Sequence, residues 1–406
     1  MNDETTPDRH VFQPHAVRHG EAPLVIFIDN GFAGFEQMAC ALRRMGVRVA
    51  AVAYGWTDKQ TRVRLHLTYG RVRFAETPDQ LQRHLREWTH DGVADVICSE
   101  GLICAVHDAA VGAEYPGEVV ERLAWRRGWA DKLAASRRFA AAGIPVPAVV
   151  PVSSAEDGAA VDGLAGMEWP RVVKAGLGAG GDGVRVAFEP TEYGEAVREL
   201  AQLDGSLFVE QFIEGRNICY CVAYDPEHVY QEGVYVSQRL DDSSTAPSRA
   251  LESIHHEAAL RLGRAVLGVI GGRGLANIEM IEDHQGRLFV IDLNTRPWGS
   301  IELLRGSGTA FDEGYLAALG LGPAPRRTVM ADGFHADVFP IASVDRIPLG
   351  HRLAARHYAS TLPTQLRTVG PRYAAAASLD MGARLVRSVL TQAAPSRVRQ
   401  RHLSHA

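Results

Sequence analysis

The stretch of residues 287–300 constrains the fold of this chain more than any other. Residues 288–293 form an apolar run of strand length, yet Asp292, Asn294 and Arg296 recur at every second position. Side chains two positions apart in a strand lie on the same face of the sheet. One face therefore carries an acid, an amide and a cation in a row. Because Mg²⁺ is typically held by one or two carboxylates together with substrate phosphates, this face predicts a metal–phosphate site, with a polar surface hairpin as the alternative.

A partner strand is predicted over residues 276–282, just before this stretch in the chain. Gln285 and Gly286 form a turn signal between the two segments, so we expect a hairpin. Glu279 lies on the same face of its strand as Asn277. Glu279 is therefore the candidate for a second carboxylate at the site.

The composition is that of a chain with ordinary hydrophobic cores. Its 406 residues, 46% hydrophobic and 22% charged, predict two or three domains. The net charge of −5 gives no reason to expect a nucleic-acid partner. No apolar run reaches the ~18 residues of a membrane span, and residues 1–20 lack the apolar stretch of a signal peptide, so we expect no membrane partner. Five cysteines, an odd number, favour a cytoplasmic location over a disulfide-stabilised fold.

Strand and helix patterns alternate from residue 23 to about residue 125. Apolar runs of strand length at residues 24–28, 47–53 and 95–98 are separated by helical spacing, for instance over residues 35–45. This alternation predicts a doubly wound, parallel α/β domain. Ligands of such sheets often bind at the carboxyl ends of the strands. Three polar residues at those ends are candidates for substrate contact, with helix capping or turn formation as the alternative: Asp29, Asn30 and Glu100.

A new unit begins with a predicted helix over residues 132–143, with Asp131 at its N-terminal end. Further on, a predicted strand ends in Lys174 and leads into the glycine-rich loop 176–183, which is followed by the β-rich residues 184–188. The loop contains a literal G-x-G-x-x-G. However, a dinucleotide fold needs a helix after this loop, and a P-loop needs a lysine after its last glycine. The loop is instead expected to join two strands.

We expect this loop to cover phosphates, with a plain flexible hairpin as the alternative. Backbone N–H groups, including those of Gly180 and Gly181, would meet phosphate oxygens, and Lys174 would supply a point charge. Residues 207–215 predict another strand, whose free edge could offer an N–H and a C=O to adenine. A helix is expected over residues 251–267 and a last strand over residues 334–340.

In chain order these motifs resemble those of the ATP-grasp superfamily, in particular its carboxylate–amine ligases, over about residues 24–320. The features that carry the resemblance are Asp131-Lys132 at a helix start, Lys174 before the glycine-rich hairpin, residues 210–215, and Glu279 followed by Asp292-x-Asn294-x-Arg296. The resemblance implies an N-terminal doubly wound parallel-sheet domain followed by a clamp of two α+β subdomains that holds ATP.

The resemblance also implies how the chain is divided. The expected parts are an N-terminal doubly wound α/β domain over residues 20–125, a small ATP-grasp subdomain with the glycine-rich lid loop over residues 126–206, a large subdomain with the adenine hinge and metal site over residues 207–340, and a C-terminal extension over residues 341–406. The extension is expected to be partly helical, and it ends in a segment rich in basic residues.

The implied cofactors are ATP and Mg²⁺, with two ions expected and Mn²⁺ as an alternative. The residues expected to contact ATP are Lys132, Lys174, Gly180, Gly181, Glu210, Gln211, Phe212, Ile213 and Asn217. The expected metal ligands are Glu279, Asp292 and Asn294. Two positions depart from the usual pattern of the superfamily: Asn217 stands where a ribose-binding glutamate is common, and Asp292 stands where a metal-binding glutamate is common.

Lys174 and Arg296 are the expected catalytic residues. By the resemblance, Arg296 would steady the transferring phosphoryl group or the acyl intermediate. Pairing of Arg296 with a neighbouring acid such as Glu302 is the structural alternative. Weaker candidates for substrate contact are Trp298, Gly299 and Ser300 at the end of the strand, and Arg239 in a long polar loop.

The implied reaction is ADP-forming: ATP activates a small-molecule carboxylate as an acyl phosphate, and an amino-acid-like amine attacks it to give an amide or peptide bond. A thiol, carbamate or carrier-bound nucleophile is the alternative within enzymes. A module that senses ATP without turnover is the alternative from a different class. Homodimerisation and docking of a carrier protein stay open at this point.

Overall fold

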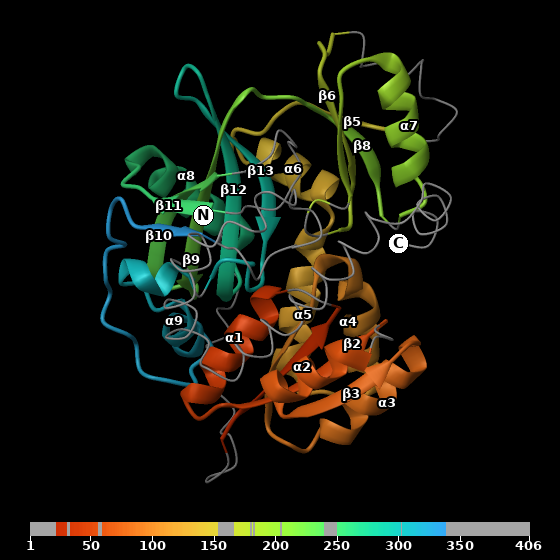
Figure 1. Ribbon diagram of the computed structural model, residues 1–406, viewed down its shortest axis with the longest axis vertical. Coiled ribbons are helices and arrows are strands. Elements are labelled where there is room, and N and C mark those ends of the chain that lie inside the picture. The colour runs from red at the N-terminus through yellow and green to blue at the C-terminus, as the bar shows by residue number, and fades with distance from the viewer. Residues whose placement is uncertain are drawn as a thin grey trace, which may run out of the picture.

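In this computed structural model the structure describes residues 22–30, 33–55, 59–152, 166–178, 181, 183–203, 205–238, 250–301 and 303–337. Gly180, Arg239, Glu302 and the expected extension 341–406 lie outside these residues. Figure 1 shows three sheets: a parallel sheet at the bottom, a small sheet at the upper right and a large sheet at the upper left. Helices α5 (Gly117–Ala130) and α6 (Lys132–Ala141) lie between them. Within the described segments, no helix has both the length and the hydrophobicity needed to span a bilayer.

The parallel sheet has the strand order β3-β2-β1-β4. Alternate residues of β1 enter two different cores: Val25 and Phe27 pack with helices α1 and α2, whereas Ile26 and Ile28 pack with α3, α4 and α5. Both faces of the sheet are therefore covered, and the predicted doubly wound fold is confirmed. The elements are β1 Leu24–Asp29, α1 Ala33–Arg44, β2 Arg48–Tyr54, α2 Lys59–Tyr69, β3 Arg71–Ala75, α3 Pro78–Trp88, β4 Val93–Ile97, α4 Ile103–Gly112 and α5 Gly117–Ala130.

The small sheet is antiparallel, with the order β5-β8-β6-β7. Helix α7 covers one face, and the small sheet has a core of its own. The predicted free edge of β8 is wrong, because β8 pairs with β5 on one side and with β6 on the other. Because β8 belongs to the small sheet, the chain passes from the small sheet to the large sheet at residues 212–214. The expected boundary was after residue 206. The elements are α6 Lys132–Ala141, β5 Val149–Pro151, β6 Arg171–Ala175, β7 Val184–Ala187, α7 Pro190–Leu200 and β8 Leu207–Gln211.

The large sheet has the order β13-β12-β9-β10-β11-β14. Both strands of the hairpin predicted to carry the metal site are confirmed. The predicted helix over residues 251–267 begins too early: residues 250–253 pair with β10 and β14, and the helix starts only after His256, whose Nδ1 accepts a hydrogen bond from the Ala259 N–H. The elements are β9 Gly215–Tyr224, β10 Val229–Gln238, β11 Ala250–Ser253, α8 Glu257–Ile270, β12 Gly274–Asp283, β13 Leu288–Asn294, α9 Phe311–Ala318 and β14 His335–Asp337.

Candidate active site

The three predicted metal ligands lie together on the hairpin of β12 and β13. Glu279 is directly opposite Asp292, and Asn277 is opposite Asn294. The Asn294 amide donates to Glu279 at 3.4 Å. The two strands thus present two carboxylate side chains and two amides at neighbouring register positions, as the period-two pattern predicted.

The register of the hairpin shifts by one residue beside the site, which the sequence pattern did not reveal. Glu279 pairs with Asp292, but Met280 pairs with Val290, so Ile291 is the extra residue of a β-bulge. Bulges re-aim groups of the strand they interrupt. Here the Ile291 carbonyl accepts a hydrogen bond from Lys174 Nζ at 3.1 Å, across the boundary between the large and small sheets.

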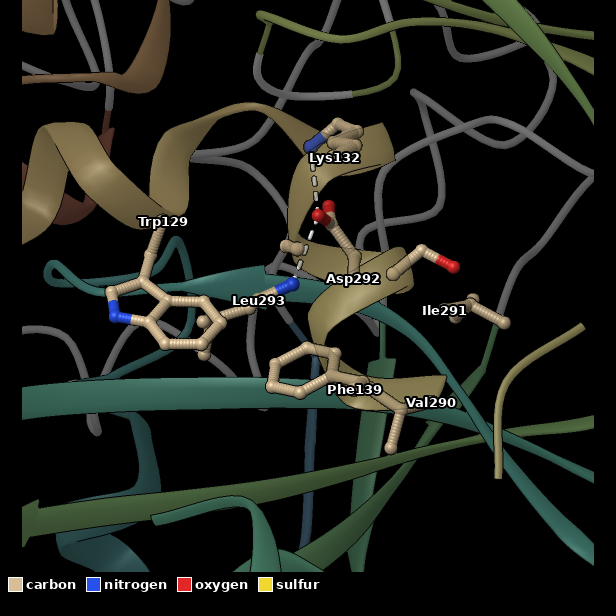
Figure 2. Close-up of a pocket in the computed structure, with 9 residues that line it drawn as sticks. Trp129, Lys132, Phe139, Val290, Ile291, Asp292 and Leu293 are labelled. Atoms are coloured by element: carbon tan, nitrogen blue, oxygen red, sulfur yellow. Dashed lines mark hydrogen bonds and ion pairs between the residues drawn. The ribbon is translucent and has the colours of Figure 1, made fainter. Parts of the chain in front are cut away.

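Lys132 is held against Asp292 by the start of helix α6. Asp131 caps this helix by accepting from the Ala134 N–H at 2.9 Å, and Lys132 follows as its first residue. Lys132 Nζ donates to Asp292 Oδ1 at 2.7 Å, as Figure 2 shows. Burial alone would lower the pKa of Lys132, but the carboxylates around it, first that of Asp292, outweigh burial and raise this pKa. Burial raises the pKa of Asp292, yet the lysine ammonium more than offsets it, so that pKa lies below its usual range.

The glycine-rich loop leaves its strand right beside the start of α6. The Lys132 N–H donates to the Gly176 carbonyl at 2.9 Å. A Cβ on Gly176 would lie 2.3 Å from both the Asp131 carboxylate and the Ser206 hydroxyl, so only glycine fits there. This close approach fixes the end of the lysine-bearing strand against the helix that carries the other lysine. Gly181 belongs to the same loop.

Lys174 is paired with an acid of the neighbouring strand in the small sheet. Lys174 Nζ lies 2.6 Å from Glu210 Oε1, and both side chains are almost completely buried. Burial raises the pKa of Glu210 above its usual value, although Lys174 opposes this. Glu210 is therefore the partner of the catalytic candidate Lys174 as well as an expected neighbour of adenine.

Arg296 is buried between the large sheet and the parallel sheet, with 3% of its surface exposed. Its Nε donates to Glu100 Oε2 at 2.8 Å, and its Nη2 donates to Asn294 Oδ1, also at 2.8 Å. Glu100 begins a short 3₁₀ turn that follows β4. The candidate at that strand end is thus brought to the hairpin of β12 and β13, and among the described residues Glu100 is an acid that pairs with Arg296.

Trp298 packs into the core rather than projecting into open space. Its ring meets Phe311 edge-on at 5.4 Å between centroids. Gly299 follows it in a turn, and the buried Ser300 hydrogen-bonds Tyr235.

Three buried polar atoms near Arg296 have no hydrogen-bond partner among the described residues. They are Trp298 Nε1, Ser99 Oγ and Asn277 Oδ1. Each adjoins the Arg296–Glu100–Asn294 group: Ser99 precedes Glu100, Asn277 faces Asn294 in the register, and Trp298 is two residues beyond Arg296. Buried polar groups are normally paired with protein, water or a ligand. Ser99 and Asn277 were not among the residues predicted from the sequence, although one lies at a strand end and the other on the Glu279 face.

The predicted adenine-contacting residues lie where the chain passes from the small to the large sheet. The Gln211 N–H donates to the Ala148 carbonyl at 2.8 Å, and its side chain is exposed. Phe212 and Ile213 are half-buried and lie beyond the last pair of the β8 ladder. Asn217 is buried on β9, opposite Ile281, and accepts from the Cys219 thiol at 3.4 Å. It therefore shares a sheet face with Glu279.

A small pocket that is partly open to solvent lies between α6 and β13. Figure 2 shows the Lys132–Asp292 pair at one end and apolar side chains around the rest. The remaining lining residues are Trp129, Ala135, Ser136, Phe139, Val290, Ile291 and Leu293. Trp129 stacks on Phe139 with ring centroids 5.4 Å apart.

Comparison with known proteins points to one superfamily. The family described as "Carbamoyl-phosphate synthase L chain, ATP binding domain" matches residues 131–300. The D-alanine–D-alanine ligase of Gloeobacter violaceus is 30% identical over 185 residues, which span 41% of this chain and 59% of that protein. Pyruvate carboxylase 1 of Caenorhabditis elegans is 32% identical over 184 residues, which span 41% of this chain and 15% of that protein.

Solved structures with a similar fold extend the match to the N-terminal part. N5-carboxyaminoimidazole ribonucleotide synthetase (purK) in complex with ADP has a TM-score of 0.60 at 15% identity, with 76% of this chain and 80% of that chain covered. The L-amino acid ligase from Bacillus licheniformis has a TM-score of 0.56 at 17% identity, with 74% of each chain covered. The chain therefore has the ATP-grasp fold, and its resemblance to the carboxylate–amine ligases of that superfamily is confirmed.

Proposed function

We propose that this protein is an ATP-dependent, ADP-forming ligase that activates a small carboxylate as an acyl phosphate and joins it to an amine. One observation carries the proposal: three cations from different parts of the chain converge on the hairpin of β12 and β13. Lys132 contacts Asp292, Lys174 contacts the Ile291 carbonyl, and Arg296 contacts Asn294. A cluster of buried cations beside oxygen ligands suits the transfer of a phosphoryl group, in which positioning and charge stabilisation dominate.

The residues of the hairpin fit Mg²⁺. Glu279, Asp292 and Asn294 offer only oxygen as a donor towards a metal, and they adjoin one another in the register. Mg²⁺ prefers six oxygen ligands and usually keeps waters and substrate phosphates among them. Two carboxylates and one amide leave room for both. When bound, the metal would neutralise phosphate charge and hold the phosphate oxygens in place.

The two lysines and the hinge fit a nucleotide. Lys132 and Lys174 would bind phosphate oxygens, and Gly180 and Gly181 would cover them with backbone N–H groups. Glu210, Gln211, Phe212, Ile213 and Asn217 would contact the adenosine. The backbone of residues 212–214 supports this assignment, because these residues lie between the two sheets and beyond the ladder of β8.

Arg296 would act on the carboxylate that receives the phosphoryl group. Its guanidinium is held on both sides, by Glu100 and by Asn294, so its direction is fixed before a substrate arrives. Preorganised donors of this kind stabilise charge that develops in the transition state without reorganisation. The carboxylate oxygen would take the terminal phosphoryl group of ATP, with ADP as the leaving group. The amine would then attack the acyl carbon, lose a proton and expel phosphate.

The substrates would bind between the parallel sheet and the end of β13. Ser99, Asn277 and Trp298 have buried polar atoms that a polar substrate could satisfy. Gly299, Ser300 and Arg239 complete the proposed substrate contacts. Relatives named as D-alanine–D-alanine ligase and L-amino acid ligase support amino-acid-like substrates. The chain spans 59% of the length of that D-alanine–D-alanine ligase. The three sheets would correspond to an N-terminal domain and the two halves of the ATP clamp.

A carboxylating reaction is the second candidate, because structural relatives include a biotin carboxylase from Campylobacter jejuni. The test incubates the protein with ATP, Mg²⁺ and single or paired amino acids, and it measures ADP, phosphate and the condensed product by mass spectrometry. The proposal predicts phosphate release that depends on an amino acid and a matching amide product. Release that depends on bicarbonate alone would favour carboxylation. No substrate-dependent release across a broad panel would favour an ATP sensor.

A further inference from the structure

Lysine is rare in this chain, and its placement is informative. Lysine occurs at only three positions, 59, 132 and 174, among 43 lysines and arginines. Two of the three lie in the candidate active site, Lys174 buried and Lys132 largely covered, and each is paired with an acid. An ammonium is a point charge on a flexible stem and can turn to a new partner, whereas a guanidinium fork is fixed by its several directed donors. The chain thus uses its exchangeable cation at the positions that face the expected phosphates.

Internal cations already contact two of the three proposed metal ligands. Asp292 Oδ1 accepts from Lys132 Nζ at 2.7 Å and also from the Leu293 N–H at 2.9 Å. Asn294 Oδ1 accepts from Arg296 at 2.8 Å. The two cations differ in how they are anchored. Arg296 is also bound to Glu100 and to the Pro297 carbonyl. Lys132 Nζ, in contrast, has Asp292 as its one hydrogen-bond partner within the described part of the chain.

The charges of this arrangement oppose a free divalent ion. Glu279 and Asp292 supply two negative charges, and the Lys132 ammonium cancels one of them. An ion placed between the two carboxylates would lie close to that ammonium, and two like charges a few ångströms apart repel strongly in a buried setting. Nucleotide phosphates would change this balance, because they give Lys132 a new anionic partner and supply further ligands to the ion.

We propose that Lys132 is an exchangeable counter-ion that occupies Asp292 until nucleotide phosphates draw it away, so that the metal site opens only together with nucleotide binding. This inference rests on the proposed function, since it takes the hairpin of β12 and β13 as the metal site of an ATP-dependent enzyme. It adds a second role to Lys132 beyond phosphate contact: the residue couples the binding of metal to the binding of nucleotide.

The test measures the binding of Mn²⁺ to the full-length protein. Binding is read from the loss of the free-ion signal in electron paramagnetic resonance. The wild type is compared with Lys132→Met and Lys174→Met, first without nucleotide and then with ADP. Methionine keeps the length of the stem and removes the charge. Lys174→Met is the matched control, because it removes the same charge from the same site, yet Lys174 contacts Glu210 and the Ile291 carbonyl rather than a proposed metal ligand.

Without nucleotide, Lys132→Met should bind Mn²⁺ about tenfold more tightly than the wild type, whereas Lys174→Met should change this affinity much less. With ADP, the wild type should gain Mn²⁺ affinity, and Lys132→Met should gain less. The inference is overturned if the wild type binds free Mn²⁺ as tightly as Lys132→Met, or if both variants gain equally. Failure of the proposed function is a different result: the wild type would bind no ADP even in the presence of Mn²⁺.

A second measurement follows Lys132 itself in the wild-type chain, and variants serve only to assign its signal. Protein labelled with ¹³C at the lysine Cε carbons gives three signals, which Lys59→Arg and Lys174→Arg assign by elimination. The Lys132 signal should move when ADP and Mg²⁺ are added together, and it should stay in place when Mg²⁺ is added alone. An equal movement with Mg²⁺ alone would show that the ion displaces Lys132 without help, and it would overturn the inference.

Discussion

The large sheet meets its two neighbours through seams of opposite character. Towards the parallel sheet the seam is largely apolar: Phe27 and Phe35 belong to the same buried cluster as Phe311 and Tyr315, and the Arg296–Glu100 pair crosses it at the end of β13. Towards the small sheet the seam is polar. The core of the small sheet contains only its own residues, and the side-chain contact across the seam runs from Lys174 to the Ile291 carbonyl.

The first seam also contains a buried ion pair. Asp95 is completely buried, 2.7 Å from Arg126 Nη2, and accepts the Tyr315 hydroxyl at 2.7 Å. It thereby joins β4, α5 and α9. The second seam carries Lys132 and Lys174, whose partners lie at the proposed nucleotide site. We infer that the apolar contacts keep the parallel and large sheets together when ligand binds, whereas the two lysines at the small sheet can exchange their partners for ligand.

Replacing Arg296 is expected to give the largest effect on activity. Arg296→Ala should lower turnover by about a thousandfold, while the affinity for ATP changes much less, because the guanidinium would stabilise charge that develops only during transfer. Arg296→Lys should recover little, since an ammonium cannot reproduce the two-sided contact with Glu100 and Asn294. Steady-state kinetics and ATP titrations of both variants measure this. Turnover close to that of the wild type would remove Arg296 from the reaction.

Replacing Asp95 is expected to affect stability rather than the site. Asp95→Asn would leave the buried Arg126 without its charged partner, which typically costs about 3–5 kcal/mol of unfolding free energy. The affinity for ATP of the folded fraction should stay unchanged, because the proposed nucleotide site lies at the other seam. Denaturant unfolding and an ATP titration separate the two quantities. A stable variant that has lost ATP binding would contradict the assignment of the two seams.

Low pH should lower the unfolding free energy through the same ion pair, by a smaller amount than Asp95→Asn does. Arg126 and Arg122 outweigh the effect of burial and lower the pKa of Asp95 to about 2, from the ordinary value of 3.8. A pKa that is depressed on folding gives stability that is present above pH ~4 and is lost as the pH falls towards 2, on the order of 2 kcal/mol here. The difference in unfolding free energy between the wild type and Asp95→Asn should therefore shrink over this pH range. A difference that is constant with pH would contradict the linkage.

The sequence predicted the parts of the fold that depend on local patterns. The doubly wound sheet followed from apolar runs, and the hairpin of β12 and β13 followed from a period of two. Two expectations failed because pairing between distant segments decided them. β8 has no free edge, since residues 149–151 pair with it. Residues 250–253 became a strand, since they lie between β10 and β14.

The sequence indicated which residues form the candidate site better than it indicated which of them contact one another. The proposed metal ligands are neighbours because adjacent strands carry them, which the sequence could indicate. The partner of Arg296 could not be chosen, because Glu100 is 196 residues away and reaches it only through the docking of the parallel sheet. The bulge at Ile291, which gives Lys174 its carbonyl partner, also left no signal in the apolar run of β13.

Hydrogen–deuterium exchange with and without ATP and Mg²⁺ reports on both seams in one measurement. We expect the ligand to slow exchange at the polar seam, in residues 171–175, 207–214 and 288–296. We expect no change at the apolar seam, in residues 93–97 and 311–318. Slower exchange at the apolar seam alone, or no change in either region, would contradict the assignment of the nucleotide site to the junction of the small and large sheets.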